Sequence, residues 1–179
     1  MTTVPVSRGA AGVALPSRPS GVHPVRAALA FEARAEAGLK TLLERWSIPA
    51  LRVALGAVFA VFGALKLIPG ASPLEALVMQ TWEKLTFGII GGQTAMIATA
   101  AIEVTAGLLL IIGGAFARVG LVVLALAFVG ILSPLLLLPQ EVYSAAGPTL
   151  TGQYIMKNAV LITAALVIAS KVLRGPKKA

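Results

Sequence analysis

The sequence predicts an all-α integral membrane protein: a four-helix antiparallel bundle with an N-terminal amphipathic cytoplasmic helix and a short interfacial helix between the first two spans. Two observations lead to this prediction. The 179-residue chain is 58% hydrophobic and only 12% charged, whereas an average soluble domain is about 25% charged. Its apolar residues also gather in four long runs, each of roughly the 20 residues that a helix needs to cross a bilayer.

The composition of the chain changes along its length and divides it into four segments. Residues 1–24 are rich in Pro, Gly and Ser without periodicity, and they predict a disordered cytoplasmic tail. Residues 25–47 alternate leucine with charged residues and predict an amphipathic helix on the membrane surface, with Trp46 as an anchor; a solvated helical linker is the alternative. Residues 48–173 hold the four-span membrane domain, and residues 174–179 form a basic cytoplasmic tail.

Proline and glycine mark the ends of the apolar runs. Pro49 is well placed at a helix start, and Pro69 with Gly70 ends the first run. Segment 72–87 is amphipathic and too polar to span, so it predicts a short helix at the outer interface, anchored by Trp82. The four predicted spans are approximately Pro49–Ile68, Gln93–Ile112, Val119–Leu138 and Gln153–Leu173.

The distribution of lysine and arginine orients these spans. The N-terminal region, the turn at 113–118 and the C-terminal tail share one side and hold eleven basic residues. The opposite loops hold one basic and three acidic residues: Lys84, Glu75, Glu83 and Glu141. Because basic loops stay on the cytoplasmic side, this asymmetry predicts that both termini are cytoplasmic. Arg52, at the inner end of the first span, is then expected to be a snorkelling membrane anchor.

The residue inventory excludes several classes of function. Cysteine is absent, which excludes disulfides, thiolate catalysis and cysteine-ligated metal sites. The single histidine, His23, lies in the N-terminal tail, so no histidine-ligated metal is expected in the membrane. No catalytic constellation is recognisable, and an independent enzyme is the weakest interpretation. The net charge of +8 frames the apolar runs without interleaved aromatics, which predicts anionic-lipid contacts and not nucleic-acid binding.

Glu103 is the most informative residue because it falls at the midpoint of the second span. Each end of the span is about ten residues, or ~15 Å, away, so the carboxyl group cannot reach the interface. A charge at the bilayer centre costs ~2.5–3.5 kcal/mol, and such groups usually face partners. Glu103 either stays neutral or ionises beside Lys66 or Lys157. Both lysines lie roughly two turns above it, so a bridging water, Gln93 or Thr99 is expected between them.

These residues predict a polar cluster in the outer leaflet, composed of Lys66, Glu103, Lys157, Gln93 and Gln153. The cluster either fixes the register of the helices or forms a ligand or proton site. Small residues predict close helix approach on two faces, Gly56, Ala60 and Ala64 in the first span and Thr99, Glu103 and Gly107 in the second. In the third span, Pro134 leaves the Gly130 carbonyl without a donor and predicts a kink near Ser133.

Several pieces of the sequence, in this order and spacing, resemble the DoxX family. The pieces are Arg52-x3-Gly56-x2-Phe59-x2-Phe62-Gly63-x2-Lys66, then Pro69-Gly70-Ala71-Ser72-Pro73, then Glu103 within IEVTAGLLLIIG, and finally PTLTGQYIMKN ending in Lys157-Asn158. The resemblance runs from about Ile48 to Leu173. The region from Met1 to Trp46 departs from the compact family pattern.

The resemblance implies a four-helix protein of the bacterial cytoplasmic (inner) membrane, in a family named for a subunit associated with thiosulfate oxidation and quinone reduction. It also implies polar membrane positions at Lys66, Glu103 and Lys157. The expected function is that of an accessory subunit in a redox or respiratory complex, with membrane lipids and a protein as partners. No cofactor is evident from the residues, and a quinone is the ligand that the resemblance allows. Two alternatives stay open: a small-molecule or proton transporter, and a structural or assembly adaptor.

Overall fold

The structure is a computed structural model that describes residues 24–173, with side chains from residue 28 onward. The predicted tails at 1–24 and 174–179 lie outside the described residues, apart from Pro24. The described chain is mostly helical, as predicted. Four helical segments are long and apolar enough to cross a membrane: Ala28–Leu65, Gly92–Ile112, Phe116–Leu137 and Leu150–Val172. The chain forms two compact units, Met1–Lys40 and Thr41–Ala179.

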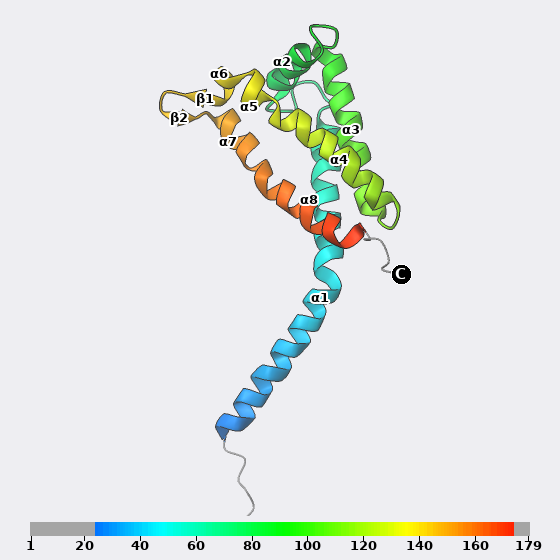
Figure 1. The fold of residues 1–179 in the computed structure, drawn as a ribbon, viewed down its shortest axis with the longest axis vertical. Coiled ribbons are helices and arrows are strands. Elements are labelled where there is room, and N and C mark those ends of the chain that lie inside the picture. Colours follow the sequence, from blue (N-terminus) through cyan, green and yellow to red (C-terminus); the bar gives the residue numbers. More distant parts are fainter. Residues whose placement is uncertain (1–23, 174–179) are drawn as a thin grey trace, which may run out of the picture. The chain divides into compact units, whose positions relative to one another are not determined.

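The described chain consists of eight helices and one two-stranded hairpin, in the order shown in Figure 1. The longer helices are α1 (Pro24–Leu65), α2 (Glu75–Leu85), α3 (Gly92–Ile112), α4 (Phe116–Leu132) and α8 (Asn158–Val172). The shorter elements are α5 (Pro134–Leu137), α6 (Pro139–Val142), the antiparallel strands β1 (Tyr143–Ser144) and β2 (Gly147–Pro148), and α7 (Leu150–Met156). Helix α2 corresponds to the short helix predicted between the first two spans.

Helix α1 continues through Pro49, so the predicted helix start at this residue is wrong. A proline inside a helix lacks one N–H group and therefore leaves a single carbonyl, that of Arg45, without its usual donor. The flanking alanines and leucines are strong helix formers and carry the helix across this gap. The predicted amphipathic helix and the first span are consequently parts of one helix, which ends at Leu65.

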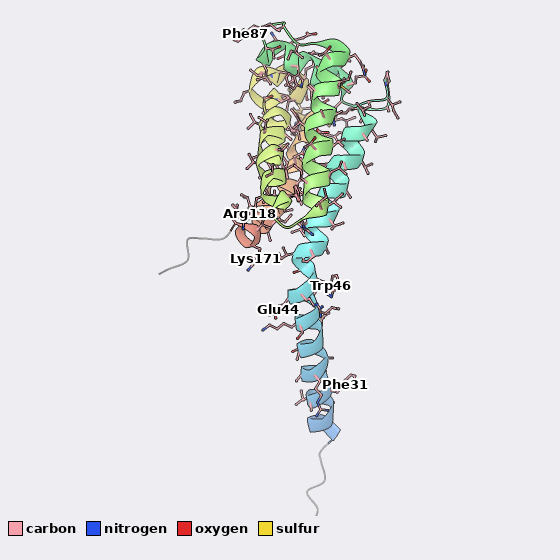
Figure 2. The ribbon with its side chains drawn as sticks, turned by 90° about the vertical axis from the view of Figure 1, so that its right-hand side faces the viewer. Phe31, Glu44, Trp46, Phe87, Arg118 and Lys171 are labelled. Carbon is pink, nitrogen blue, oxygen red and sulfur yellow. The ribbon has the colours of Figure 1, made fainter. Side chains whose placement is uncertain are left out.

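The first unit is described from Pro24 to Lys40 and is helical throughout this part. Its described side chains, from Ala28 onward, are all exposed. They include the large apolar residues Leu29, Phe31 and Leu39 (Phe31 is labelled in Figure 2). Exposed leucine and phenylalanine side chains agree with an amphipathic helix, while its place on a membrane surface stays a prediction.

The third predicted span is interrupted where Pro134 predicts a kink. Helix α4 ends at Leu132, and α5 begins at Pro134. The Ser133 hydroxyl donates a hydrogen bond of 2.8 Å to the Gly130 carbonyl. Pro134 has no N–H group and so cannot donate to this carbonyl. The helix is therefore broken at the residue where the kink is predicted, and the Ser133 side chain replaces the missing backbone donor.

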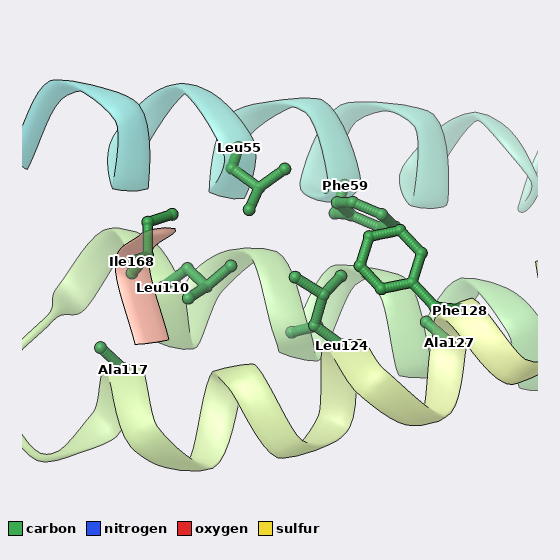
Figure 3. Packing of buried hydrophobic residues seen from close by; sticks show 9 residues of the cluster. Leu55, Phe59, Leu110, Ala117, Leu124, Ala127, Phe128 and Ile168 are labelled. Atoms are coloured by element: carbon green, nitrogen blue, oxygen red, sulfur yellow. The ribbon is translucent and has the colours of Figure 1, made fainter. Parts of the chain in front are cut away.

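The core of the second unit lies where α1, α3, α4 and α8 meet (Figure 3). Nine buried residues form it: Leu55, Phe59, Ala106, Leu110, Ala117, Leu124, Ala127, Phe128 and Ile168. The rings of Phe59 and Phe128 pack edge to face with centroids 5.5 Å apart, an arrangement that aromatic pairs prefer. A smaller cluster at one end joins α2 to α6 and α7 through Leu77, Leu138, Val142 and Ile155.

Helices α1 and α3 approach each other so closely that their backbones touch. A Cβ atom placed on Gly107 would lie 2.5 Å from the Gly56 carbonyl oxygen and 2.6 Å from the Ala60 nitrogen. The prediction of close approach through small residues is thus confirmed for Gly56, Ala60 and Gly107. Further along α1, Gly63 lies against Glu103. Because higher numbers on α1 meet lower numbers on α3, the two helices run antiparallel here.

We expect Gly107→Ala to lower the free energy of unfolding by ~1–3 kcal/mol, because the new methyl group would push against backbone atoms that cannot rotate away. Gly130→Ala is the matched control, since a Cβ atom there has no atom within 4 Å. Thermal unfolding of both purified variants in one detergent measures the difference. Equal unfolding midpoints for the two variants would show that α1 and α3 are further apart than described.

Candidate functional site

An ion pair joins the end of α1 to the middle of α3. The Lys66 Nζ atom lies 2.5 Å from Glu103 Oε2, and the two side chains are only 12% and 6% exposed. Glu103 lies eleven residues after Gly92 and nine before Ile112, close to the centre of its helix. Among the described residues, no buried side-chain nitrogen or oxygen lacks a hydrogen-bond partner. The carboxyl group is therefore buried, and its Oε2 atom accepts a hydrogen bond from Lys66.

Two local features bring these charges together. A Cβ atom on Gly63 would lie 2.9 Å from the Glu103 Cβ, so only a glycine admits the glutamate against α1. Lys66 follows the last residue of α1, and its ammonium also donates to the Phe62 carbonyl at 3.4 Å. Because Phe62 lies one turn earlier, the lysine side chain extends back along α1 toward the level of Glu103. The expected bridge through a water or another polar residue is therefore unnecessary.

The structure leaves the other three members of the predicted cluster apart from this pair. Lys157 is exposed between α7 and α8, with its Nζ atom 4.8 Å from the centroid of the Tyr154 ring. Gln153 donates to the Pro148 carbonyl at 3.4 Å and so serves its own loop. Gln93 is exposed in the first turn of α3, about 15 Å along the helix from Glu103. Residues expected at similar heights along the predicted spans therefore differ in their directions in space.

Trp82 makes a contact that sequence reasoning missed. Its indole N–H donates to the Thr99 hydroxyl oxygen at 2.7 Å, and that hydroxyl donates to the Ala95 carbonyl at 2.8 Å. Trp82 is half-buried and ties α2 to α3, whereas the sequence predicts an interfacial anchor. Thr99 lies one helical turn before Glu103, so the bond fixes α2 beside the same stretch of α3. The available signal was the hydroxyl of Thr99 in the polar stripe of the second span, which can accept a hydrogen bond from a neighbouring helix.

The two remaining predicted anchors lie away from the ion pair. Trp46 is 56% exposed, and the Arg45 guanidinium lies 5.8 Å from its ring centroid. Arg52 is half-buried, and its guanidinium occupies the place where a side chain on Gly113 would be. Gly113 caps the C-terminal end of α3 with a positive φ of 84°. A cation there meets the negative end of the helix dipole, so Arg52 has a structural contact in addition to any role as an anchor.

The ion pair can neutralise its own charge and hold two helices together, and within residues 24–173 no three metal-ligating side chains gather around a common point. The fold and the pair define a helical protein with four segments capable of crossing a membrane. A scan against models of protein families found no match, and neither did searches of curated proteins and of solved structures. Any function must therefore be argued from the residues of this chain.

A double-mutant cycle tests whether the pair holds the helices together. We expect Lys66→Met to cost about 3 kcal/mol of stability, because it strands the Glu103 carboxyl in apolar surroundings. Glu103→Met should cost only about 1 kcal/mol, because Lys66 lies near a helix end and can turn outward. The double variant should approach the parent, since two apolar side chains leave no buried charge.

Unfolding in detergent micelles measures all three variants, with Lys84→Met as the control at an exposed position of α2. A double variant whose loss equals the sum of the two single losses would mean that the two charges do not interact.

Proposed function

We propose that the protein is an integral membrane protein whose four long helices form an antiparallel bundle in the bacterial inner membrane, and that it serves as an accessory subunit of a redox or respiratory complex. The Lys66–Glu103 pair is the observation on which this proposal rests. Both residues occupy polar membrane positions that the DoxX resemblance implies. The pair satisfies its own charges, which suits a part that holds α1 against α3 in hydrocarbon.

Exposed apolar side chains support insertion into a membrane. Val61 on α1 is 57% exposed, and Val122 on α4 and Val160 on α8 are each 71% exposed. Soluble monomers rarely leave large contiguous apolar patches uncovered. These helix faces are therefore suited to contact with lipid or with an apolar protein partner in the membrane.

The charges of the second unit support an orientation with both termini in the cytoplasm. Arg52, Arg118 and Lys171 surround one cavity. The acidic residues Glu75 and Glu83 of α2 and Glu141 of α6 belong to helices that share the smaller apolar cluster. Basic residues favour the cytoplasmic side, so this proposal puts α2 and the β1–β2 hairpin outside. The exposed leucines near the start of α1 would then lie on the inner membrane surface.

Cysteine labelling tests this orientation cleanly, because the parent chain contains no cysteine. Ala145→Cys, exposed between β1 and β2, should react with a membrane-impermeant maleimide in intact cells. Ala115→Cys, exposed between α3 and α4, should react only after the cells are permeabilised. The reverse pattern would invert the proposed orientation, and labelling of both sites in intact cells would contradict a membrane-spanning arrangement.

The geometry of the pair favours a subunit over a proton carrier. A carrier carboxyl must exchange protons with water on each side in turn, yet the Glu103 side chain is 6% exposed and one of its oxygens is held by Lys66. Neither residue lines the cavity beside Arg52 and Arg118 or the groove between α4 and α8. A charge pair closed in this way serves packing better than transport.

Purification from native membranes in a mild detergent tests the proposed role. The tagged parent should elute with a redox enzyme and with extractable quinone, and the isolated assembly should reduce or oxidise an added quinone. Lys66→Arg keeps the ion pair and should keep this association, whereas Lys66→Met should lose it because α1 loosens from α3. A parent chain that elutes alone, without a redox enzyme or quinone, would refute the proposal.

A further inference from the structure

A cavity of about 460 Å³ lies at one end of the second unit and is lined by three cations from three different helices. Arg52 comes from α1, Arg118 from α4 and Lys171 from α8. Figure 2 shows Arg118 and Lys171 close together at the end of the unit away from Phe87. The other lining residues are small or apolar, and among residues 24–173 no acidic side chain lines the cavity.

Contacts with the backbone hold the two arginines at this cavity. The Arg118 Nε atom donates to the Val172 carbonyl at 3.2 Å, which leaves the terminal nitrogens of its guanidinium for other acceptors. The Arg52 guanidinium packs against Gly113. In the part of the chain that the structure describes, none of the three cations forms an ion pair with a carboxylate. Three like charges around one cavity repel each other, and an anion placed among them removes this repulsion.

An apolar groove of about 490 Å³ begins at the same arginine. It runs between α4 and α8, and its walls include Leu121, Ala125, Phe128, Ile162, Ala165 and Ala169. Along α4 the groove extends from Arg118 to Leu132, a length of about 21 Å at 1.5 Å per residue. One leaflet of a bilayer has a hydrocarbon depth of about 15 Å, half of the ~30 Å core. The groove is therefore long enough for an acyl chain of a lipid.

We infer that these two cavities form one binding site for an anionic glycerophospholipid. Its phosphate lies among Arg52, Arg118 and Lys171, and one acyl chain lies in the groove between α4 and α8. Arg118 lines both cavities, so it stands where the headgroup of a lipid joins its chains. A soluble phosphate compound would use only the cationic cavity, whereas the groove that begins at the same arginine favours the lipid. The site requires insertion in a membrane but does not involve the Lys66–Glu103 pair.

Native mass spectrometry of the detergent-purified full chain tests the headgroup. We expect the parent to retain phosphatidylglycerol at least tenfold better than phosphatidylcholine with the same acyl chains, and an excess of glycerol phosphate should not displace it. The double variant Arg118→Gln/Lys171→Gln should lose at least tenfold in phosphatidylglycerol retention, since each basic residue near anionic lipid contributes a factor of about five. Lys84→Gln on α2 should behave as the parent. Arg118→Lys with Lys171 intact should retain the lipid.

A second pair of variants tests the groove. Ala165→Phe fills the groove and should reduce retention of phosphatidylglycerol, whereas Val160→Phe, on an exposed position of the same helix, should not. Equal retention of the two lipids by the parent would overturn the inference, as would an equal loss in Lys84→Gln. Displacement by glycerol phosphate would reassign the cavity to a soluble phosphate. The unfolding midpoint of each variant is measured in parallel, and Arg118→Lys keeps the test valid if the double variant unfolds.

Discussion

A carboxyl group in the middle of an apolar helix is stable only beside a polar or cationic partner, and the packing of α1 against α3 depends on this constraint. Glu103 cannot reach either end of α3, so the partner must come to it. Lys66 does so from the end of α1, but only because α1 lies against α3 with almost no side chains between them. Glycines at 56, 63 and 107 create this contact. The ion pair and the glycines are thus parts of one arrangement, since either would be unfavourable without the other.

The same stretch of α3 also receives α2. The Trp82 indole bonds to Thr99, one turn before Glu103, so two elements are fixed to one segment of α3 through polar contacts. Polar contacts are directional, whereas apolar packing against lipid or against other helices is not. In a chain with 58% hydrophobic residues, a few buried hydrogen bonds can therefore determine which helices become neighbours. One of the two roles predicted for the polar cluster, fixing the register of the helices, is of this kind.

The helices themselves could be predicted because their signals are local. Long apolar runs bounded by Pro and Gly predict α3 within a residue of its observed bounds, and Pro134 predicts the interruption at Ser133. The predicted helix start at Pro49 is wrong because a proline at a helix start and a proline inside a helix can have the same sequence neighbours. The loss of one hydrogen bond is outweighed by the helix formers around it.

The sequence identifies the charged residues of the ion pair but not which lysine is the partner of Glu103. A charge in an apolar run identifies Lys66, Glu103 and Lys157 as unusual, yet the sequence treats both lysines as equivalent partners. The structure distinguishes them by direction: the Lys66 side chain extends back along α1, while the Lys157 ammonium lies over the Tyr154 ring. The role of Gly63 depends on the crossing of α1 and α3, which is a tertiary property that no local pattern encodes.

Two helix–helix contacts, or seams, differ in their chemistry: the seam between α1 and α3 and the seam between α4 and α8. The difference suggests that the two seams have different roles. Between α1 and α3 the backbones touch, and a buried ion pair closes the seam, so nothing larger than a side chain fits there. Between α4 and α8 the walls are apolar and leave a groove that begins at Arg118, which forms no ion pair within the described part of the chain. A seam of the first kind resists separation because opening it leaves two charges in apolar surroundings without their partners. An apolar molecule in a seam of the second kind is stabilised there, since filling the groove adds van der Waals contacts without breaking a polar bond. The contact between α1 and α3 therefore fixes the geometry of the second unit, and the proposed lipid would bind where α4 and α8 leave space.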